Sequence, residues 1–232
     1  MMPRLILSLL FAVLSLAASA QPEGTPKFQL RAIYHNPLAP FAELYVPGAG
    51  DLQPLNLSLE GISEPQEVSL AKGILRLYSS AEIDPENPLA NLAAQGTVPA
   101  GATRIIIVLF PSPADSKPPY RMMILPDDVK SFPKGESRVL NATGLKLAMK
   151  AGEHSLQLAP GKVVSVPQVK SVNDLNRAPT AFYQQGEQKN DWNLFAERPM
   201  QFAETCRNII LIYQMPNVAL PQLRTLVDTD LR

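Results

Sequence analysis

The pattern of hydrophobic and polar positions along the chain is mainly that of β-strands. Apolar residues occupy every second position of segments 55–59, 145–149 and 156–158. Because successive side chains of a strand point to opposite faces, this period of two predicts strands with one buried and one solvated face. Segments 105–110 and 209–213 are apolar at every position, which predicts strands covered on both faces or lying at the centre of a sandwich.

Glycine and proline separate these segments. Gly73, Gly152 and Gly161 lie in short stretches next to strand-like segments. Glycine adopts positive φ without steric cost, so these positions predict tight turns. The 23 prolines fall between the apolar runs rather than within them, which disfavours helices. Together these features predict a mostly β fold.

The strand-like segments recur in the same order, which predicts an internal duplication. Each copy begins with an arginine-led segment, continues through an alternating strand and a stretch that ends at a glycine, and closes with a long apolar run. These pieces are residues 31–36, 55–59, 69–73 and 104–110 in the first copy, and residues 138–143, 145–149, 157–161 and 207–213 in the second.

The duplication predicts two tandem β-sandwich-like (immunoglobulin-like) units, each of a usual size for one domain. We expect the first unit to span residues 21–118 and the second to span residues 119–232. The joint is expected in the proline-rich stretch 111–119 or in residues 125–135. Because the second unit is short of strand-like segments, the two units are expected to share a core and pack as one body.

Few segments have helical features. Residues 88–95 have proline at the start and Gly96 after the end, and residues 221–231 place apolar side chains on one helical face, so both predict short helices. Residues 173–188 are polar and have no hydrophobic period, which predicts a long loop.

The N-terminal segment is typical of a secretory signal peptide. Arg4 is followed by an apolar run at residues 5–17 and by a small-x-small sequence that ends at Ala20. This predicts a signal peptide over residues 1–20, with Gln21 as the new N-terminus. An uncleaved membrane anchor is the alternative, but a spanning helix needs about 20 apolar residues. We therefore expect an exported protein, periplasmic or extracellular.

The balance of charge bears on the class of partner, and the cysteine content bears on how the fold is stabilised. The 21 basic and 21 acidic residues cancel, which gives no electrostatic reason to expect nucleic acid as a partner. Cys206 is the only cysteine, so an internal disulfide is excluded and stability must come from a buried core. We expect Cys206 to be a small buried residue, and pairing between two chains is the alternative.

Residues suited to catalysis or metal binding are few and scattered. His35, expected in a turn, and His154, expected to start a strand, do not lie at metal-binding spacing from other ligands. The sequence contains no nucleophile elbow and no glycine-rich phosphate loop. The adjacent Asp127 and Asp128 are expected to cap a turn. We therefore expect no catalytic residue, no metal ion and no cofactor.

The best candidate binding patch contains Trp192 and Tyr183. Trp192 lies in the polar stretch 188–193, and Tyr183 lies upstream of it. Aromatic rings beside polar groups on a wet surface are typical of sugar-binding sites. The alternative is that Trp192 and Phe195 pack the predicted loop back onto the core, since large aromatic side chains dominate burial.

Several turn and strand segments resemble exported bacterial β-sandwich (immunoglobulin-like) proteins of uncharacterised function. The resemblance rests on residues 132–143 and 145–147, on Ala159-Pro160-Gly161, and more loosely on residues 34–46. It implies export and a β-sandwich fold, and it implies no catalytic residue. By analogy of fold, such proteins are more often structural or adhesive than enzymatic.

We therefore expect a non-enzymatic binding or cell-envelope-associated module that contacts a protein partner through loops or sheet edges. The alternative is a carbohydrate-binding module that uses Trp192 and Tyr183. A third interpretation is an enzyme whose site is assembled from residues distant in sequence. A deep polar pocket around His35 or His154 would favour this third interpretation.

Overall fold

The computed structural model describes residues 27–35, 43–113, 115–188 and 190–229. The predicted signal peptide, with its cleavage site between Ala20 and Gln21, lies outside these residues.

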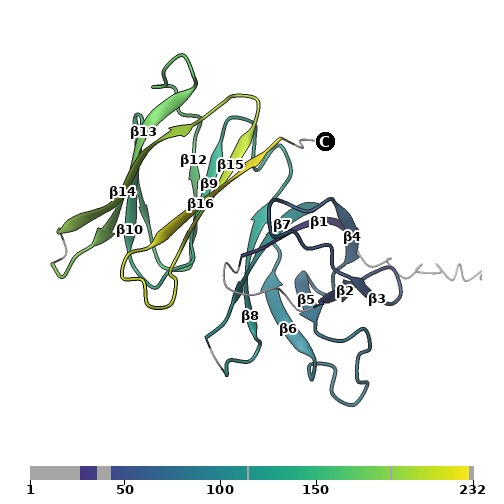
Figure 1. Cartoon of the computed structure of the whole chain (residues 1–232). Coiled ribbons are helices and arrows are strands. Elements are labelled where there is room, and N and C mark those ends of the chain that lie inside the picture. The colour runs from purple at the N-terminus through teal and green to yellow at the C-terminus, as the bar shows by residue number, and fades with distance from the viewer. Residues whose placement is uncertain (1–26, 36–42, 114, 189, 230–232) are drawn as a thin grey trace, which may run out of the picture.

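All regular elements in the described part of the chain are strands, and they form two sandwich-like units (Figure 1). This confirms the mostly β fold. It follows that no described helix is of the length and hydrophobicity that crossing a membrane requires. The first unit contains β1 (Lys27–Tyr34), β2 (Tyr45–Pro47), β3 (Leu52–Pro54), β4 (Gln66–Ser69), β5 (Ile74–Tyr78), β6 (Leu92–Thr97), β7 (Arg104–Pro111) and β8 (Tyr120–Pro126). The second contains β9 (Ser137–Asn141), β10 (Leu147–Ala151), β11 (His154–Leu158), β12 (Val163–Val166), β13 (Arg177–Gln185), β14 (Trp192–Gln201), β15 (Arg207–Tyr213) and β16 (Gln222–Asp228).

The two units have the same topology. The first has sheets of order β4-β1-β7-β8 and β3-β2-β5-β6, and the second has sheets of order β12-β9-β15-β16 and β11-β10-β13-β14. Each strand of the second unit therefore takes the place of the strand eight positions earlier. Even the parallel pair recurs, as β1 with β7 and as β9 with β15. This agrees with the predicted duplication.

Registers make individual positions equivalent between the units. Arg31 is opposite Ile106 in the first parallel pair, and Arg138 is opposite Ile209 in the second. The two arginine-led segments and the two long apolar runs were therefore matched correctly. The alternating segments were not, because β10 takes the place of β2, whereas residues 55–59 lie outside any strand. The backbone bonds there are scattered: the Leu55 N–H bonds to the Leu44 carbonyl, the Tyr34 N–H bonds to the Ser58 carbonyl, and the Asn56 N–H bonds to the side chain of Gln66.

Three further predictions are corrected. Residues 88–95, and residues 221–229 of the second predicted helix, hold no helix and instead contribute to β6 and β16, since pairing with β5 and β15 outweighs weak local helix preference; residues 230 and 231 lie outside the described residues. Residues 173–188 are not a long loop, because most of them form β13, which pairs with β10 and β14. The turn glycines Gly73, Gly152 and Gly161 do have positive φ, as predicted.

The chain passes from the first unit to the second after β8. This strand pairs with β7 along its whole length and so belongs to the first unit. The expected division at residue 118 would separate the two strands. The first strand of the second unit, β9, begins at Ser137, so the crossing lies between Pro126 and Ser137.

A third core joins the two units. Each sandwich has its own core, and another apolar cluster contains residues from β1, β7 and β8 together with residues from β9, β15 and β16. Ile105 and Ile107 face the first core, whereas Ile106 and Val108 face the shared one. The two continuous apolar runs are therefore strands covered on both faces, as predicted.

Candidate functional site

A buried cluster of charges lies at one end of the shared core. Arg31 donates hydrogen bonds to Asp127 and Asp228 at 2.7–2.9 Å, and Arg207 donates to the same two carboxylates, at 2.6 Å to Asp127. All four residues are at most 3% exposed. The two positive and two negative charges balance. The bonds from Arg31 to Asp228 link the two units, and so does the bond from Arg207 to Asp127.

The cluster breaks the symmetry of the duplication. Arg207 is equivalent to Arg104, and Arg31 is equivalent to Arg138. Arg104 forms a longer ion pair with Asp127, at 3.7 Å, and Arg138 bonds instead to Glu136. Therefore only one arginine of each equivalent pair, Arg31 or Arg207, donates hydrogen bonds to both carboxylates of the cluster.

The electrostatics of the cluster favour its charged form. Burial by itself would raise the pKa of Asp228, but the hydrogen bonds and charges of Arg31 and Arg207 outweigh burial and lower that pKa. From the sequence, Asp127 was expected to cap a turn, and neither arginine was expected to have a functional role. The sequence does contain one signal, because each copy has an arginine at both positions: Arg31 and Arg104 in the first copy, and Arg138 and Arg207 in the second. We assign the cluster a structural role, which is to fix the two units against each other.

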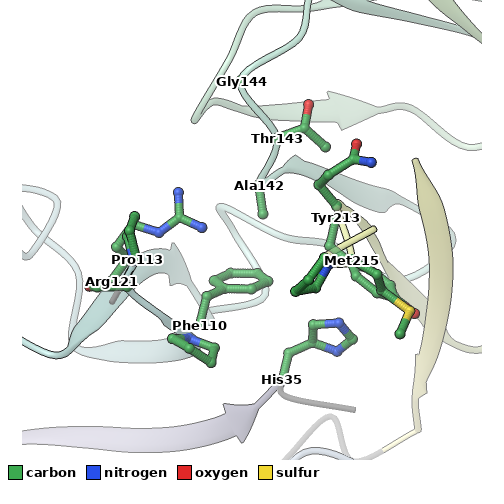
Figure 2. A pocket seen from close by; sticks show the side chains of 13 residues that line it. His35, Phe110, Pro113, Arg121, Ala142, Thr143, Gly144, Tyr213 and Met215 are labelled. Atoms are coloured by element: carbon green, nitrogen blue, oxygen red, sulfur yellow. The ribbon is translucent and has the colours of Figure 1, made fainter. Parts of the chain in front are cut away.

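A cavity of ≈ 460 Å³ opens at the other end of the shared core (Figure 2). Its walls are largely apolar and come from both units. Phe110 and Pro113 belong to the first unit, and Ala142, Tyr213 and Met215 belong to the second. Such a volume is in the range of small-molecule sites.

His35 is the one histidine among the cavity's lining residues, and it directly follows β1. The residue is 4% exposed, and its ring lies edge-on against Phe110 and Tyr213, with centroids 5.6 and 4.0 Å away. Arg224 Nη1 lies 3.4 Å from His35 Nδ1. Nε2 is buried and has no hydrogen-bond partner among the described residues.

The protonation state of His35 follows from these neighbours. Burial, and then the positive charge of Arg224, lower the pKa of His35 from 6.5 to about 4. The ring is therefore neutral at pH 7. A guanidinium can only donate, so Nδ1 is the acceptor and the proton is on Nε2.

The other histidine lies elsewhere. His154 starts β11, as predicted, and its Nε2 is 3.2 Å from the carbonyl oxygen of Gln168. In the described residues, no group of three or more His, Cys, Asp or Glu side chains is arranged to hold a metal ion.

The predicted aromatic patch lies on the outer face of the sheet β11-β10-β13-β14. Phe182 points into the second core, so the next residue, Tyr183, points outward. Trp192 begins β14 and is paired with Gln185, two residues after Tyr183. The structure thus brings Trp192 and Tyr183 to one face of one sheet.

Two hollows flank the Trp192 side chain. One, of ≈ 280 Å³, is also lined by Tyr183, Lys150 and Ser155, and the other, of ≈ 370 Å³, is also lined by polar side chains that include Gln185. Lys150 Nζ lies 5.8 Å from the Tyr183 ring centroid. The surface therefore combines aromatic rings with amide, hydroxyl and ammonium groups.

The alternative for Trp192 was that it packs onto the core with Phe195. Phe195 does so, since it contacts the second core and lies 6.1 Å from the Phe182 ring. Trp192 is half-buried and lines the outer hollows instead. The two aromatic residues are visible in the sequence, whereas Lys150 and Ser155 are not, because they reach the patch only through strand pairing.

Cys206 is a buried residue, 8% exposed, in the turn before β15. Burial, together with the nearby charge of Asp228, raises the pKa of its thiol. We predict that a thiol reagent labels Cys206 much more slowly in the folded protein than in denaturant. Timed labelling followed by mass spectrometry measures this. A disulfide-linked dimer on a non-reducing gel would contradict the prediction.

Comparison with protein families gives no matching family model, and comparison with curated proteins gives no significant match.

Proposed function

We propose that this protein is an exported, non-enzymatic binding module, and that it binds glycans on the outer face of the sheet β11-β10-β13-β14. The observation that carries the proposal is the placing of Trp192 between two hollows, one of which is also lined by Tyr183. The apolar face of an aromatic ring packs against the C–H groups of a sugar, and nearby polar groups hydrogen-bond to its hydroxyls.

The polar groups of this face suit such a ligand. Gln157 lines both hollows, Ser155 lines one of them, and Lys150 adds a cation beside the Tyr183 ring. Amide and hydroxyl groups both donate and accept hydrogen bonds, as sugar hydroxyls do. Because these side chains stand on paired strands, their spacing is set by the sheet rather than by a loop.

A protein partner that adds a strand at the β14 edge is less well supported. The outer strand β14 carries Glu197, Arg198 and Pro199 in succession. Charged residues and proline on an edge strand oppose pairing with another chain. The aromatic face is therefore a better candidate for the binding surface than the β14 edge.

Replacing Trp192 by alanine should weaken retention on polysaccharide at least about 10-fold, because a buried aromatic anchor commonly contributes about 2 kcal/mol or more to binding. Affinity electrophoresis in gels that contain soluble polysaccharides measures the change. Leu175→Ala is the matched control, since it removes an apolar side chain that is 62% exposed and lines neither hollow.

Tyr183→Ala should weaken retention as well, whereas Leu175→Ala should leave it unchanged. Equal retention of the wild-type protein and the Trp192→Ala variant would remove the glycan proposal. Binding to an envelope protein would then become the leading interpretation of the module.

A further inference from the structure

The cavity at the joint between the units is lined by residues that the duplication makes equivalent. Tyr213 is equivalent to Phe110, and Ala142 is equivalent to His35, because the backbone N–H groups of His35 and Ala142 bond to the equivalent carbonyls of Leu109 and Ile212. These four lining residues therefore form two equivalent pairs, one member of each pair coming from each unit. A small alanine faces the cavity in one unit and an imidazole faces it in the other, which leaves space and makes the cavity chemically one-sided.

Two polar groups of this cavity are available to a ligand. The N–H of His35 Nε2 is buried without an acceptor among the described residues, and leaving such a donor unpaired costs about 1–3 kcal/mol. The neighbouring aromatic rings offer at most a weak N–H···π contact. In Figure 2, one ring nitrogen of His35 faces the side of the cavity where Phe110 and Tyr213 lie.

The second group is the guanidinium of Arg121, which is exposed and forms one side of the cavity (Figure 2). No described carboxylate lies within ion-pair distance of Arg121, and no acidic residue lines the cavity. The site thus offers apolar walls, an unneutralised cation at its mouth and an unpaired donor inside. Its charge is complementary to an anion with an apolar body.

We propose that this cavity binds a small apolar carboxylic acid that carries a second oxygen at its far end. The carboxylate pairs with Arg121, the apolar body packs against Phe110, Tyr213 and Met215, and the second oxygen accepts the proton of His35 Nε2. This site lies in the joint between the units, away from the glycan face, and does not depend on glycan binding.

Isothermal titration of the purified chain with 4-hydroxyphenylacetate and 8-hydroxyoctanoate tests the proposal. We expect saturable binding of at least one of the two acids. Replacement of its carboxylate by an alcohol should weaken that binding about 10-fold or more, since hydrogen bonds to charged groups contribute about 1.5–3 kcal/mol. Absence of saturable binding of both acids would overturn the proposal.

Two variants separate the roles of the residues. Arg121→Gln, which introduces the residue found at the equivalent position 222, should weaken acid binding about 10-fold and leave the protein folded, because Arg121 is exposed. His35→Phe should weaken the binding of the hydroxy acids but not the binding of phenylacetate, which lacks the second oxygen. Unchanged acid binding in Arg121→Gln would overturn the assignment. Trp192→Ala should bind the acids normally, so a failure of this proposal is distinguishable from a failure of the glycan proposal.

Discussion

Replacing Arg207 by methionine should lower the free energy of unfolding by about 3–5 kcal/mol, the usual cost of removing one partner from a buried ion pair. The variant would leave Asp127 and Asp228 with Arg31 as their main cation inside a core that is closed to solvent. It would also remove the donors to the carbonyls of Asp127 and Phe132. Chemical denaturation of the two proteins at pH 7 measures the difference.

Lys27→Met is the matched control for this variant. Lys27 forms an ion pair with Glu67 at 2.8 Å, but both side chains are well exposed. Exposed pairs contribute about 0–1 kcal/mol, so the control should change stability little. If Arg207→Met were no more destabilising than Lys27→Met, the buried cluster would not be what fixes the two units together.

Acidification from pH 6.5 to about pH 4 should destabilise the protein through His35 by up to about 3 kcal/mol. The pKa of this histidine is lowered on folding from 6.5 to about 4. Between these values the unfolded chain binds a proton that the folded protein does not. Falling pH therefore stabilises the unfolded state relative to the folded state. The contribution of neutral His35 to the free energy of unfolding is fully present only above pH 6.5.

The His35→Phe variant isolates this effect from other titrations. Phenylalanine has a similar shape and does not titrate, and the facing groups Arg224 and Tyr213 are unchanged. We expect the stability difference between the wild type and the variant to be constant above pH 6.5 and to shift in favour of the variant between pH 6.5 and pH 4. Stability curves that run parallel across this interval would contradict the burial of a neutral His35.

The sequence predicted those parts of the fold that are set by local pattern. The runs at 105–110 and 209–213 have no polar alternation because alternate side chains face two different cores. Segments 88–95 and 173–188 were misread because pairing with neighbouring strands, rather than their own period, determines their conformation. Pairing partners distant in sequence leave no trace in a local window.

The candidate sites also differ in how far the sequence predicts them. Trp192 and Tyr183 stood out because aromatic residues in a polar stretch are visible in the sequence. The contacts of the charged cluster could not be predicted, since Arg31 meets Asp127 across 96 residues and Asp228 across 197, and the recurrence of the arginines does not show their partners. The cavity at His35 depends on how the ends of the two units meet, which no single segment determines.

The central claim is that the outer face of the sheet β11-β10-β13-β14 binds a glycan, and the protein carries its own reporter for the test. Trp192 is the only tryptophan in the chain, so its fluorescence reports on this face alone. The decisive measurement is a fluorescence titration of the folded protein with a panel of soluble oligosaccharides of cellulose, xylan, chitin and peptidoglycan. We predict a saturable change in Trp192 emission with at least one of them. Emission that stays constant across the whole panel would contradict the account.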